Sequence, residues 1–446
     1  MKKHGREIFY YVNFGVFFGA VFILGLAFVF KPKEIVSTDE KRKLAAFPQW
    51  DLDSVAKGVY MKRVDEYIKD HFPFRDAFIS HAFAMEELRG WKNEELIVFD
   101  APVKPKKNIK KDKSNAAIGA DTAMLVEEVI EDNRGLVISN GRAMQLFGGN
   151  NSRAKNYAAM VNTYYNALKD EGVNVFNVVV PSAAEFYLPQ PKYKHLKEQE
   201  KRNISMIYEN EAEGIKKVDA YSKIAAHKDE YVYFRTDHHW TGLGAYYAYT
   251  AFCETAGFDP VPLDKMVKKA QNKFFGSLYF YLNRNSTLAE HYDTVHYWKL
   301  PDNPACVVYR KDNMNKAIKS HVIVDAAGGY SVFLGADYPL IKMENGPKNG
   351  KSIVVIKNSY GNPFITYLVS HYEKVYSIDF RYYNGGIIDF IRENKVTDLL
   401  FINGSISANT PYTSSRIKHL MYSKNKPKTT KDKDTTASKT VKDTLK

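Results

Sequence analysis

Cysteine is scarce in this sequence of 446 residues. Only Cys253 and Cys306 are present, and they form neither a CxxC pair nor a cluster with histidine. This pattern excludes the cysteine-rich zinc modules. Two cysteines can pair in an oxidising compartment, but their spacing does not decide the matter. We expect no disulfide.

The sequence also has little excess charge outside three short stretches, although its formal net charge is +13. Residues 1–8, 104–113 and 424–446 contribute +2, +5 and +5, so all the remaining residues together contribute only +1. A nucleic-acid groove needs lysine and arginine gathered on a folded surface. We therefore expect no nucleic-acid partner. The Lys/Thr-rich residues 424–446 are typical of a disordered tail, with loose attraction to anionic envelope polymers as the functional alternative.

Long apolar runs are absent except near the N-terminus. Residues 9–30 form a run without a charge. The run has the length that a helix needs to cross a bilayer. The run is about twice as long as the apolar region of a signal peptide, and no small-x-small cleavage site follows. We expect an uncleaved signal anchor, preceded by a cytoplasmic segment of residues 1–8. The flanking charges weakly favour the opposite orientation, but large domains cross largely regardless of them.

The rest of the chain divides by composition. Residues 31–100 predict a juxtamembrane helical segment with a helix that ends at 70–73, and residues 101–130 a Lys-rich linker. From 131 to 423 short apolar strands alternate with helices, which predicts an α/β domain with a parallel sheet flanked by helices. Strands are expected at 135–139, 173–180, 231–234, 353–356, 374–378 and 399–403, and helices at 154–168, 198–217, 241–253, 363–371 and 387–393.

Two of these strands are followed by reactive side chains. Asp237 and His239 come after strand 231–234, and Ser359 comes after strand 353–356. Functional groups gather beyond the carboxyl ends of parallel strands. A serine hydroxyl becomes a nucleophile when a neutral imidazole takes its proton, and the imidazole needs a carboxylate to fix its tautomer. We expect Gly361 to allow a tight bend after the serine.

Other interpretations remain open at this point. An isolated Asp-x-His is usually a surface or capping pair, and a serine before Tyr-Gly is ordinary turn chemistry. Ser182 is a rival nucleophile, although the residues that follow it predict a helix N-cap instead. His238 should point away from His239 in an extended backbone and make a structural hydrogen bond. Metal ligation by residues 237–239 is disfavoured, because the further acidic and histidine clusters of metal phosphoesterases are missing.

The string Thr236-Asp237-His238-His239-Trp240 resembles the motif that names the DHHW protein family of bacteria, and the chain is identified as a member. That family is similar to alginate and exopolysaccharide O-acetyltransferases with an SGNH-hydrolase-like domain, which carry a related T-D-x-H-W motif and a later D-S-[FY]. The resemblance spans residues 40–404. It implies a triad of Asp237, His239 and Ser359 in a permuted motif order. Asn358 departs from the aspartate that the family usually has before the serine.

The resemblance also implies further site residues and partners. The expected oxyanion-hole and substrate residues are Tyr360, Gly276, Asn403, Arg381, Tyr382 and Trp240. For Arg381 the structural alternative is an ion pair with Asp379. No cofactor is expected. The implied partners are a polysaccharide acceptor, a membrane-bound O-acyltransferase that supplies acetyl groups, and a polysaccharide synthase, all reached from the extracytoplasmic side of the membrane.

The sequence thus predicts an anchored O-acetyltransferase that acts on an exopolysaccharide or cell-envelope polysaccharide. Two alternatives use the same residues differently. A polysaccharide acetyl esterase would have the same triad with water as acceptor, and a non-catalytic polysaccharide-binding scaffold would fit the substitution at Asn358.

Overall fold

The computed structural model describes residues 2–31, 44–56, 58–74, 78, 97–99, 135–189, 194–282 and 284–422. The expected linker at 101–130 and the expected tail at 424–446 lie outside these residues. The following paragraphs concern the described part of the chain.

An eight-stranded sheet forms the centre of the protein, in the order β5-β4-β13-β11-β12-β10-β8-β9. The first five strands are mutually parallel, and the last three are antiparallel to their neighbours. The sheet is thus mostly parallel, as expected: four of its parallel strands (β4, β11, β12 and β13) were predicted, whereas β5 and the three antiparallel strands were not. The bounds are β5 (Lys216–Lys217), β4 (Asn174–Val180), β13 (Asp398–Gly404), β11 (Ser352–Lys357), β12 (Lys374–Asp379), β10 (Leu340–Met343), β8 (Ala305–Arg310) and β9 (Asn313–His321).

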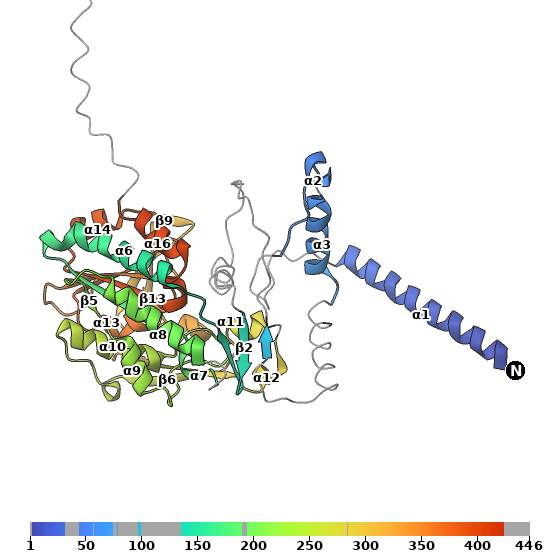
Figure 1. The fold of residues 1–446 in the computed structure, drawn as a ribbon, viewed down its shortest axis with the longest axis horizontal. Helices are drawn as coiled ribbons and strands as arrows, with labels where there is room; N and C mark the ends of the chain where they lie inside the picture. The colour runs from blue at the N-terminus through green and yellow to red at the C-terminus, as the bar shows by residue number, and fades with distance from the viewer. Residues whose placement is uncertain are drawn as a thin grey trace, which may run out of the picture.

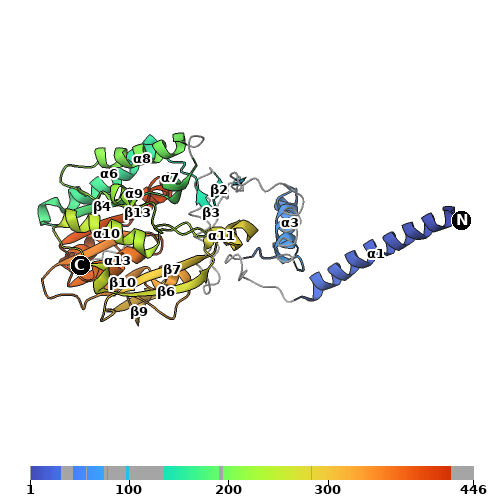
Figure 2. The ribbon, with the colours of Figure 1, turned by 90° about the horizontal axis from the view of Figure 1, so that it is seen from below.

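Helices cover both faces of this sheet, as Figures 1 and 2 show. The apolar strands supply side chains to both layers: Val354 and Ile356 of β11 pack into one core, and Ile353 and Val355 into the other. Burial on both faces explains why the parallel strands are continuous apolar runs. One layer contains α6 (Asn151–Leu168), α8 (Lys194–Glu209), α14 (Ile387–Glu393) and α16 (Pro411–His419). The other contains α7 (Ala183–Tyr187), α9 (Ala220–Ala226), α10 (Gly242–Ala256) and α13 (Gly361–Leu368).

Two smaller sheets lie beside the central one. The three-stranded sheet packs on two short helices through an apolar cluster that includes Leu136 and Leu278. The hairpin β6–β7 packs on a 3-10 turn through a cluster that includes Phe234, Val295 and Phe333. The bounds are β1 (Ile97–Phe99), β2 (Leu136–Ser139), β3 (Arg142–Gln145), α11 (Ser277–Tyr281), α12 (Ser286–Ala289), β6 (Val267–Phe274), β7 (Asp293–Lys299) and η3 (Gly329–Val332). The remaining short elements are η1 (Lys169–Glu171), η2 (Leu263–Lys265) and α15 (Ser405–Ala408).

The N-terminal helices are drawn to one side of the α/β region in Figure 1. They are α1 (Lys2–Phe30), α2 (Leu52–Ala56) and α3 (Val59–His71). Within α1, Tyr11–Phe30 is long and apolar enough to cross a membrane, by length and composition. The helix expected to end at 70–73 does end there. It is separated from α2 at Gly58, whose φ of 68° suits glycine.

Three local predictions differ from the structure. Residues 231–234 form no strand of the sheet and make only an isolated bridge between Tyr233 and Trp240. The helix predicted at 198–217 begins at Lys194 and ends at Glu209. Ser182 lies at the N-cap position of α7, as expected, but its side chain makes no capping hydrogen bond. Helix α10, by contrast, begins as expected, because the Thr241 side chain accepts a hydrogen bond from the Gly244 N–H. Cys253 and Cys306 are free and buried.

Candidate active site

Ser359 lies in the short turn that joins β11 to α13, at the carboxyl end of the parallel sheet. Its side chain is buried, with the residue 2% exposed. The turn is closed by hydrogen bonds from the Gly361 N–H to the Asn358 carbonyl (3.0 Å) and from the Asn362 N–H to the Ser359 carbonyl (3.1 Å). Gly361 is needed for a reason other than the expected one: a Cβ atom there would lie 2.7 Å from the Cβ of Lys357. The glycine therefore allows close packing rather than an unusual backbone angle.

The loop that contains the Asp-His-His-Trp string is anchored from both sides. The carboxylate of Asp293, on β7, accepts hydrogen bonds from the Arg235 N–H (2.7 Å) and from the N–H and hydroxyl of Thr236 (2.7 and 2.5 Å). The guanidinium of Arg142 donates to the carbonyls of Tyr233 and Phe234. Irregular backbone is thus satisfied by side chains rather than by a strand ladder, which is why an apolar run at 231–234 misleads a sequence-based assignment.

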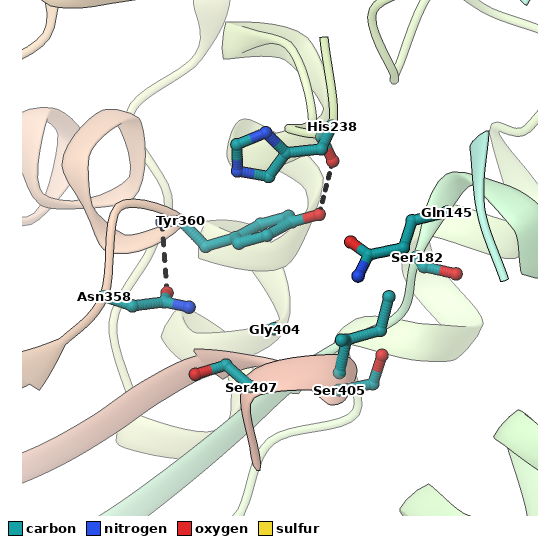
Figure 3. A pocket seen from close by; sticks show the side chains of 9 residues that line it. Gln145, Ser182, His238, Asn358, Tyr360, Gly404, Ser405 and Ser407 are labelled. Atoms are coloured by element: carbon teal, nitrogen blue, oxygen red, sulfur yellow. Dashed lines mark hydrogen bonds between the residues drawn. The ribbon is translucent and has the colours of Figure 1, made fainter. Parts of the chain in front are cut away.

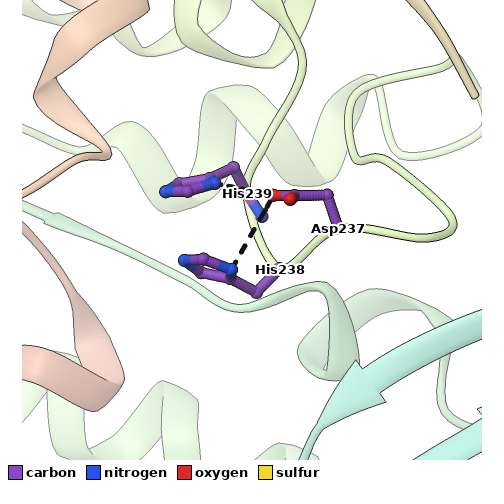
Figure 4. Close-up of side chains that lie close together, drawn as sticks. All are labelled: Asp237, His238 and His239. Atoms are coloured by element: carbon purple, nitrogen blue, oxygen red, sulfur yellow. Dashed lines mark hydrogen bonds and ion pairs between the residues drawn. The ribbon is translucent and has the colours of Figure 1, made fainter. Parts of the chain in front are cut away.

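The three residues of the predicted triad come together. His239 Nε2 lies 2.7 Å from Ser359 Oγ, and His239 Nδ1 lies 2.6 Å from Asp237 Oδ1. Asp237 Oδ1 also accepts from the His239 N–H (2.9 Å), and Oδ2 accepts from the Ser277 N–H (2.8 Å). Figure 4 shows the carboxylate facing both neighbouring imidazoles. This is the connectivity that a serine nucleophile needs: hydroxyl to imidazole to carboxylate.

The Asp237 carboxylate stays ionised although it is buried. Burial alone would raise its pKa, but the neighbouring His239 and His238 imidazoles and the Ser277 N–H outweigh burial, and the pKa lies well below its usual range. A carboxylate in this state orients His239 with the Nδ1 hydrogen directed at it. Nε2 is then the atom that can take a proton from Ser359.

His238 does not point away from His239, as the sequence had suggested. The two rings lie side by side, with centroids 3.7 Å apart. The structural hydrogen bond that we expected does exist, between His238 Nδ1 and Ser277 Oγ (2.7 Å). Burial lowers the pKa of His238 to about 3, so the ring is neutral at physiological pH. The reason for the difference is the turn at 237–239, which is compact rather than extended.

Asp237, His238 and His239 also form a cluster whose ligand atoms lie within 4.8 Å of one another, as a metal site would require. Most of these atoms already have partners: both carboxylate oxygens of Asp237, both ring nitrogens of His239 and Nδ1 of His238. The residues present therefore fit a proton-transfer chain better than a metal site, which would have to break several of these bonds.

Tyr330 is a site residue that the sequence analysis missed. Its ring stacks on His239 with centroids 4.0 Å apart and planes 11° from parallel, and its hydroxyl donates to the Ser359 carbonyl (3.0 Å). Burial first, and then the nearby charge of Asp237, raise the pKa of Tyr330 far above its ordinary value, so the hydroxyl stays a donor. The residue lies on η3 with no motif around it, and only the three-dimensional structure brings it to the triad.

The expected oxyanion-hole donors are only partly available. The Gly276 N–H donates to Thr236 Oγ1 (2.9 Å), and the Asn403 amide donates to the Tyr157 hydroxyl (2.9 Å). The Tyr360 N–H is directed at Asn358 Oδ1 (3.2 Å). Among the described residues, the Ser359 N–H makes no hydrogen bond and is the candidate donor that the turn leaves open. The Gly276 N–H and the Asn403 amide are thus already bonded within the protein, and their role at an oxyanion stays a prediction.

Arg381 belongs to a buried group of charges that we call the ionic quartet: Lys357, Asp337, Asp379 and Arg381. Lys357 Nζ lies 3.0 Å from both Asp337 Oδ1 and Asp379 Oδ2, and an Arg381 Nη lies 2.7 Å from both carboxylates. Burial would raise the pKa of Asp337, but Lys357 and Arg381 outweigh it and hold the pKa below its usual range. The ion pair between Arg381 and Asp379, expected as the structural alternative, is therefore present, and contact of Arg381 with substrate stays a prediction.

The other two aromatic candidates are also buried. The Trp240 indole N–H donates to the Tyr360 carbonyl (3.0 Å), which ties the motif loop to the turn after Ser359. The Tyr382 ring lies under the Lys311 ammonium, 4.6 Å from its centroid. Neither side chain lines the pocket described next, whereas Tyr360 does.

A pocket opens beside the triad, between the residues that flank Ser359 and the ends of three further strands (Figure 3). Its enclosed part has a volume of only about 20 Å³, and the wider space around it, about 310 Å³, includes open solvent. Tyr360 forms one wall, and its hydroxyl donates to the His238 carbonyl (2.5 Å). The lining residues are Gln145, Ser182, His238, Asn358, Tyr360, Gly404, Ser405, Ile406 and Ser407.

Fold and site together define an α/β protein with a serine–histidine–aspartate arrangement at the edge of a mostly parallel sheet. The model of the DHHW protein family matches residues 40–106 and 98–378, and the chain belongs to this family. No curated protein sequence matches the chain.

Two solved structures illustrate the similarity. A DHHW family protein from Eubacterium siraeum is 33% identical, with a TM-score of 0.59, over 65% of this chain and 96% of that one. Bacillus cereus PatB1, one structure of which has a sulfonyl adduct, is 17% identical, with a TM-score of 0.53, over 62% of this chain and 98% of that one. At this identity the likeness to PatB1 concerns the fold alone.

Proposed function

We propose that this protein is a membrane-anchored, extracytoplasmic O-acetyltransferase that transfers acetyl groups to a polysaccharide through Ser359. One observation carries the proposal: the continuous hydrogen-bonded chain from Ser359 Oγ through His239 to the ionised Asp237. Such a chain supports the proposal because it can move a proton from and to a serine that attacks an acyl carbon.

The reaction has two halves. Ser359 Oγ attacks the carbonyl carbon of an acetyl donor while its proton moves to His239 Nε2. The tetrahedral oxyanion is bound by the Ser359 N–H, and its collapse expels the donor group, which takes the proton from His239. A sugar hydroxyl then gives its proton to His239 and attacks the acyl-enzyme, and Ser359 leaves with that proton. Atoms and charges balance with no cofactor.

Asn358 fits catalysis, although it departs from the usual aspartate. Its side-chain oxygen faces the Tyr360 N–H two residues later (3.2 Å), a turn-stabilising contact that a carboxylate would also make. The amide can therefore do this structural work without the charge. The asparagine at 358 was the main reason for the alternative of a non-catalytic scaffold, and this contact weakens that reason.

The proposal extends to the whole chain. In it residues 1–8 are cytoplasmic, 9–30 anchor the protein, 31–100 form the juxtamembrane segment, and 131–423 form an SGNH-like catalytic domain with permuted motif order. A membrane-bound O-acyltransferase supplies the acetyl group from inside the cell, and a polysaccharide synthase delivers the acceptor. The helix at Tyr11–Phe30 and the order Asp237, His239, Ser359 along the chain support this arrangement.

The acetyl content of the cell's exopolysaccharide tests the proposal. Strains with the wild-type chain, Ser359→Ala and His239→Ala are compared, with membrane levels of each protein checked by immunoblot. We expect acetylation to fall to the level of a deletion strain in both variants. Unchanged acetylation in both would refute the proposal. An increase above wild type in both would instead identify the esterase.

A further inference from the structure

The pocket beside the triad contains a buried atom that the fold leaves without a partner. Among the described residues, His238 Nε2 is buried and makes no hydrogen bond, and His238 is 8% exposed. The ring cannot turn freely, because Nδ1 is bonded to Ser277 Oγ and the backbone carbonyl to the Tyr360 hydroxyl. An unsatisfied buried polar group costs about 1–3 kcal/mol, and each such group in a native protein calls for an explanation.

The tautomer of His238 follows from its surroundings. The Asp237 carboxylate lies 3.7 Å from His238 Nδ1, and a negative charge favours the hydrogen on the nearer nitrogen. With the hydrogen on Nδ1, the neutral ring presents a lone pair at Nε2. His238 is then a hydrogen-bond acceptor toward the pocket and cannot donate to an oxyanion or to an acetyl carbonyl.

Two serine hydroxyls on the opposite side of the pocket are also hydrogen-bond acceptors. Ser182 Oγ donates to Glu200 Oε2 (2.8 Å) and Ser405 Oγ donates to Glu200 Oε1 (2.5 Å). Glu200 is itself buried, 1% exposed. Because their hydrogens are directed to Glu200, the two hydroxyl oxygens present lone pairs on their remaining sides. The pocket thus gathers acceptors at His238, Ser182 and Ser405 beside the side-chain amides of Gln145 and Asn358, which also carry N–H donors. The Tyr360 ring and Ile406 supply apolar surface.

Because the enclosed part has room for a hydroxyl rather than for a whole ring, a ligand must insert O–H groups, which both donate and accept, and keep its frame at the open side of the pocket. A sugar ring has this chemistry, whereas an acetyl group has only a carbonyl acceptor and a methyl. Building on the proposed function, we propose that this pocket is the acceptor subsite, in which His238 Nε2 accepts a hydrogen bond from a hydroxyl of the sugar that receives the acyl group. The residues on either side of Ser359, Asn358 and Tyr360, line this pocket.

The experiment uses the purified full-length protein in detergent. The donor is p-nitrophenyl acetate, and the acceptor is the host's own exopolysaccharide after mild alkaline deacetylation. The initial burst of p-nitrophenol reports acylation of Ser359, and the acceleration of turnover by the polysaccharide reports transfer. The variants are His238→Phe, which keeps a ring but removes the acceptor nitrogen, His238→Gln, which restores an acceptor oxygen, and Ser405→Ala. Ser414→Ala, in a separate hollow along α16, is the matched control.

We expect the acceptor-dependent rate to fall about 10-fold in His238→Phe and about 3-fold in Ser405→Ala, the range for loss of one hydrogen bond. The burst should fall by a smaller factor, His238→Gln should recover part of the transfer, and Ser414→Ala should behave as wild type. Equal losses of burst and transfer in His238→Phe, or transfer at the wild-type rate, would overturn the inference. So would a wild-type burst that the polysaccharide does not accelerate. The absence of any wild-type burst would instead count against the proposed function itself.

Discussion

Two buried polar clusters lie on either side of the turn after β11, and they differ in how their charges are paired. The ionic quartet holds Lys357 two residues before the nucleophile, and the triad holds Ser359. Both occupy the carboxyl end of the sheet, and the charged side chains and imidazole of the two clusters are at most 8% exposed. In the quartet two cations face two carboxylates at 2.7–3.0 Å. In the triad one carboxylate faces an imidazole, which faces a neutral hydroxyl.

This difference explains why we expect chemistry at only one of the two clusters. In the quartet each charge is neutralised by an opposite charge, so its best use is to fix geometry. Lys357 packs against Gly361, and the pair fixes the turn that presents Ser359. In the triad the charge is at one end and the hydroxyl at the other, so a proton can move along it. The ionic quartet thus holds the turn in place, and the triad beside it contains the proton that can move between Ser359 and His239.

The largest expected effect is on activity when the triad is broken. Asp237→Asn removes the charge but keeps the shape, and we expect acylation by p-nitrophenyl acetate to fall about 10⁴-fold because His239 loses its fixed tautomer. Ser359→Ala should remove acylation at the serine altogether. The burst of p-nitrophenol measures both. Thermal unfolding should change little, and a similar loss of stability and activity would mean that Asp237 is a structural residue.

The next largest effect is on stability when the quartet is broken. Lys357→Met leaves two buried carboxylates with only Arg381, and we expect the free energy of unfolding to fall by about 3–5 kcal/mol. This corresponds to a drop in unfolding temperature of about 10 °C, measured by differential scanning fluorimetry in detergent. The double variant Lys357→Met with Asp379→Asn removes one charge of each sign and should lose less. A double variant that loses the sum of the two single losses would show that the charges are not coupled.

The pH dependence of stability tests the contribution of the ionic quartet in a second way. The pKa of Asp337 in the folded protein lies below its usual value of about 3.9. Its contribution to stability is therefore complete above about pH 5 and is lost as the pH falls through the acid range. Asp337→Asn should destabilise the protein at pH 7 by about 2 kcal/mol and flatten the decline in unfolding temperature between pH 5 and pH 3. Part of the decline should remain, because the pKa of Asp237 is lowered in the same direction. If unfolding temperature depends on pH in Asp337→Asn as it does in the wild type, Asp337 does not contribute to the acid sensitivity of the fold.

The parallel half of the sheet could be predicted from the sequence, and the antiparallel half could not. Strands β4, β11, β12 and β13 are continuous apolar runs because helices bury them on both faces. The residues of β9 are mostly exposed, and β10 is only four residues long, so neither has a pattern that differs from a loop. Their places depend on pairing with distant strands, which no local window contains.

The same distinction applies to the site. Asp237, His239 and Ser359 could be predicted because each belongs to a motif, even though one of the supposed strands before them was wrong. Gly276 and Arg381 are bonded within the protein, to Thr236 and to the ionic quartet, which the sequence did not show, because a motif indicates which residues gather but not which hydrogen bonds they make. The acceptor character of the pocket depends on Glu200, a residue on α8 that no pattern connects with Ser182 or Ser405.

The smallest expected effect is at Tyr330, which contacts His239 and Ser359 without belonging to the triad. Tyr330→Phe keeps the ring on His239 and removes the hydroxyl from the Ser359 carbonyl. We expect the acylation rate to fall about 3-fold, as for one lost hydrogen bond. Tyr330→Leu removes the stacked ring as well, and we expect a loss of about 10-fold. The rate of labelling of Ser359 by a fluorophosphonate measures both. If the two variants lose the same amount, the stacked ring contributes nothing, and the hydroxyl alone positions the nucleophile. If His239 needs the ring to stay in line with Ser359, only Tyr330→Leu will slow labelling strongly while unfolding at nearly the same temperature as Tyr330→Phe.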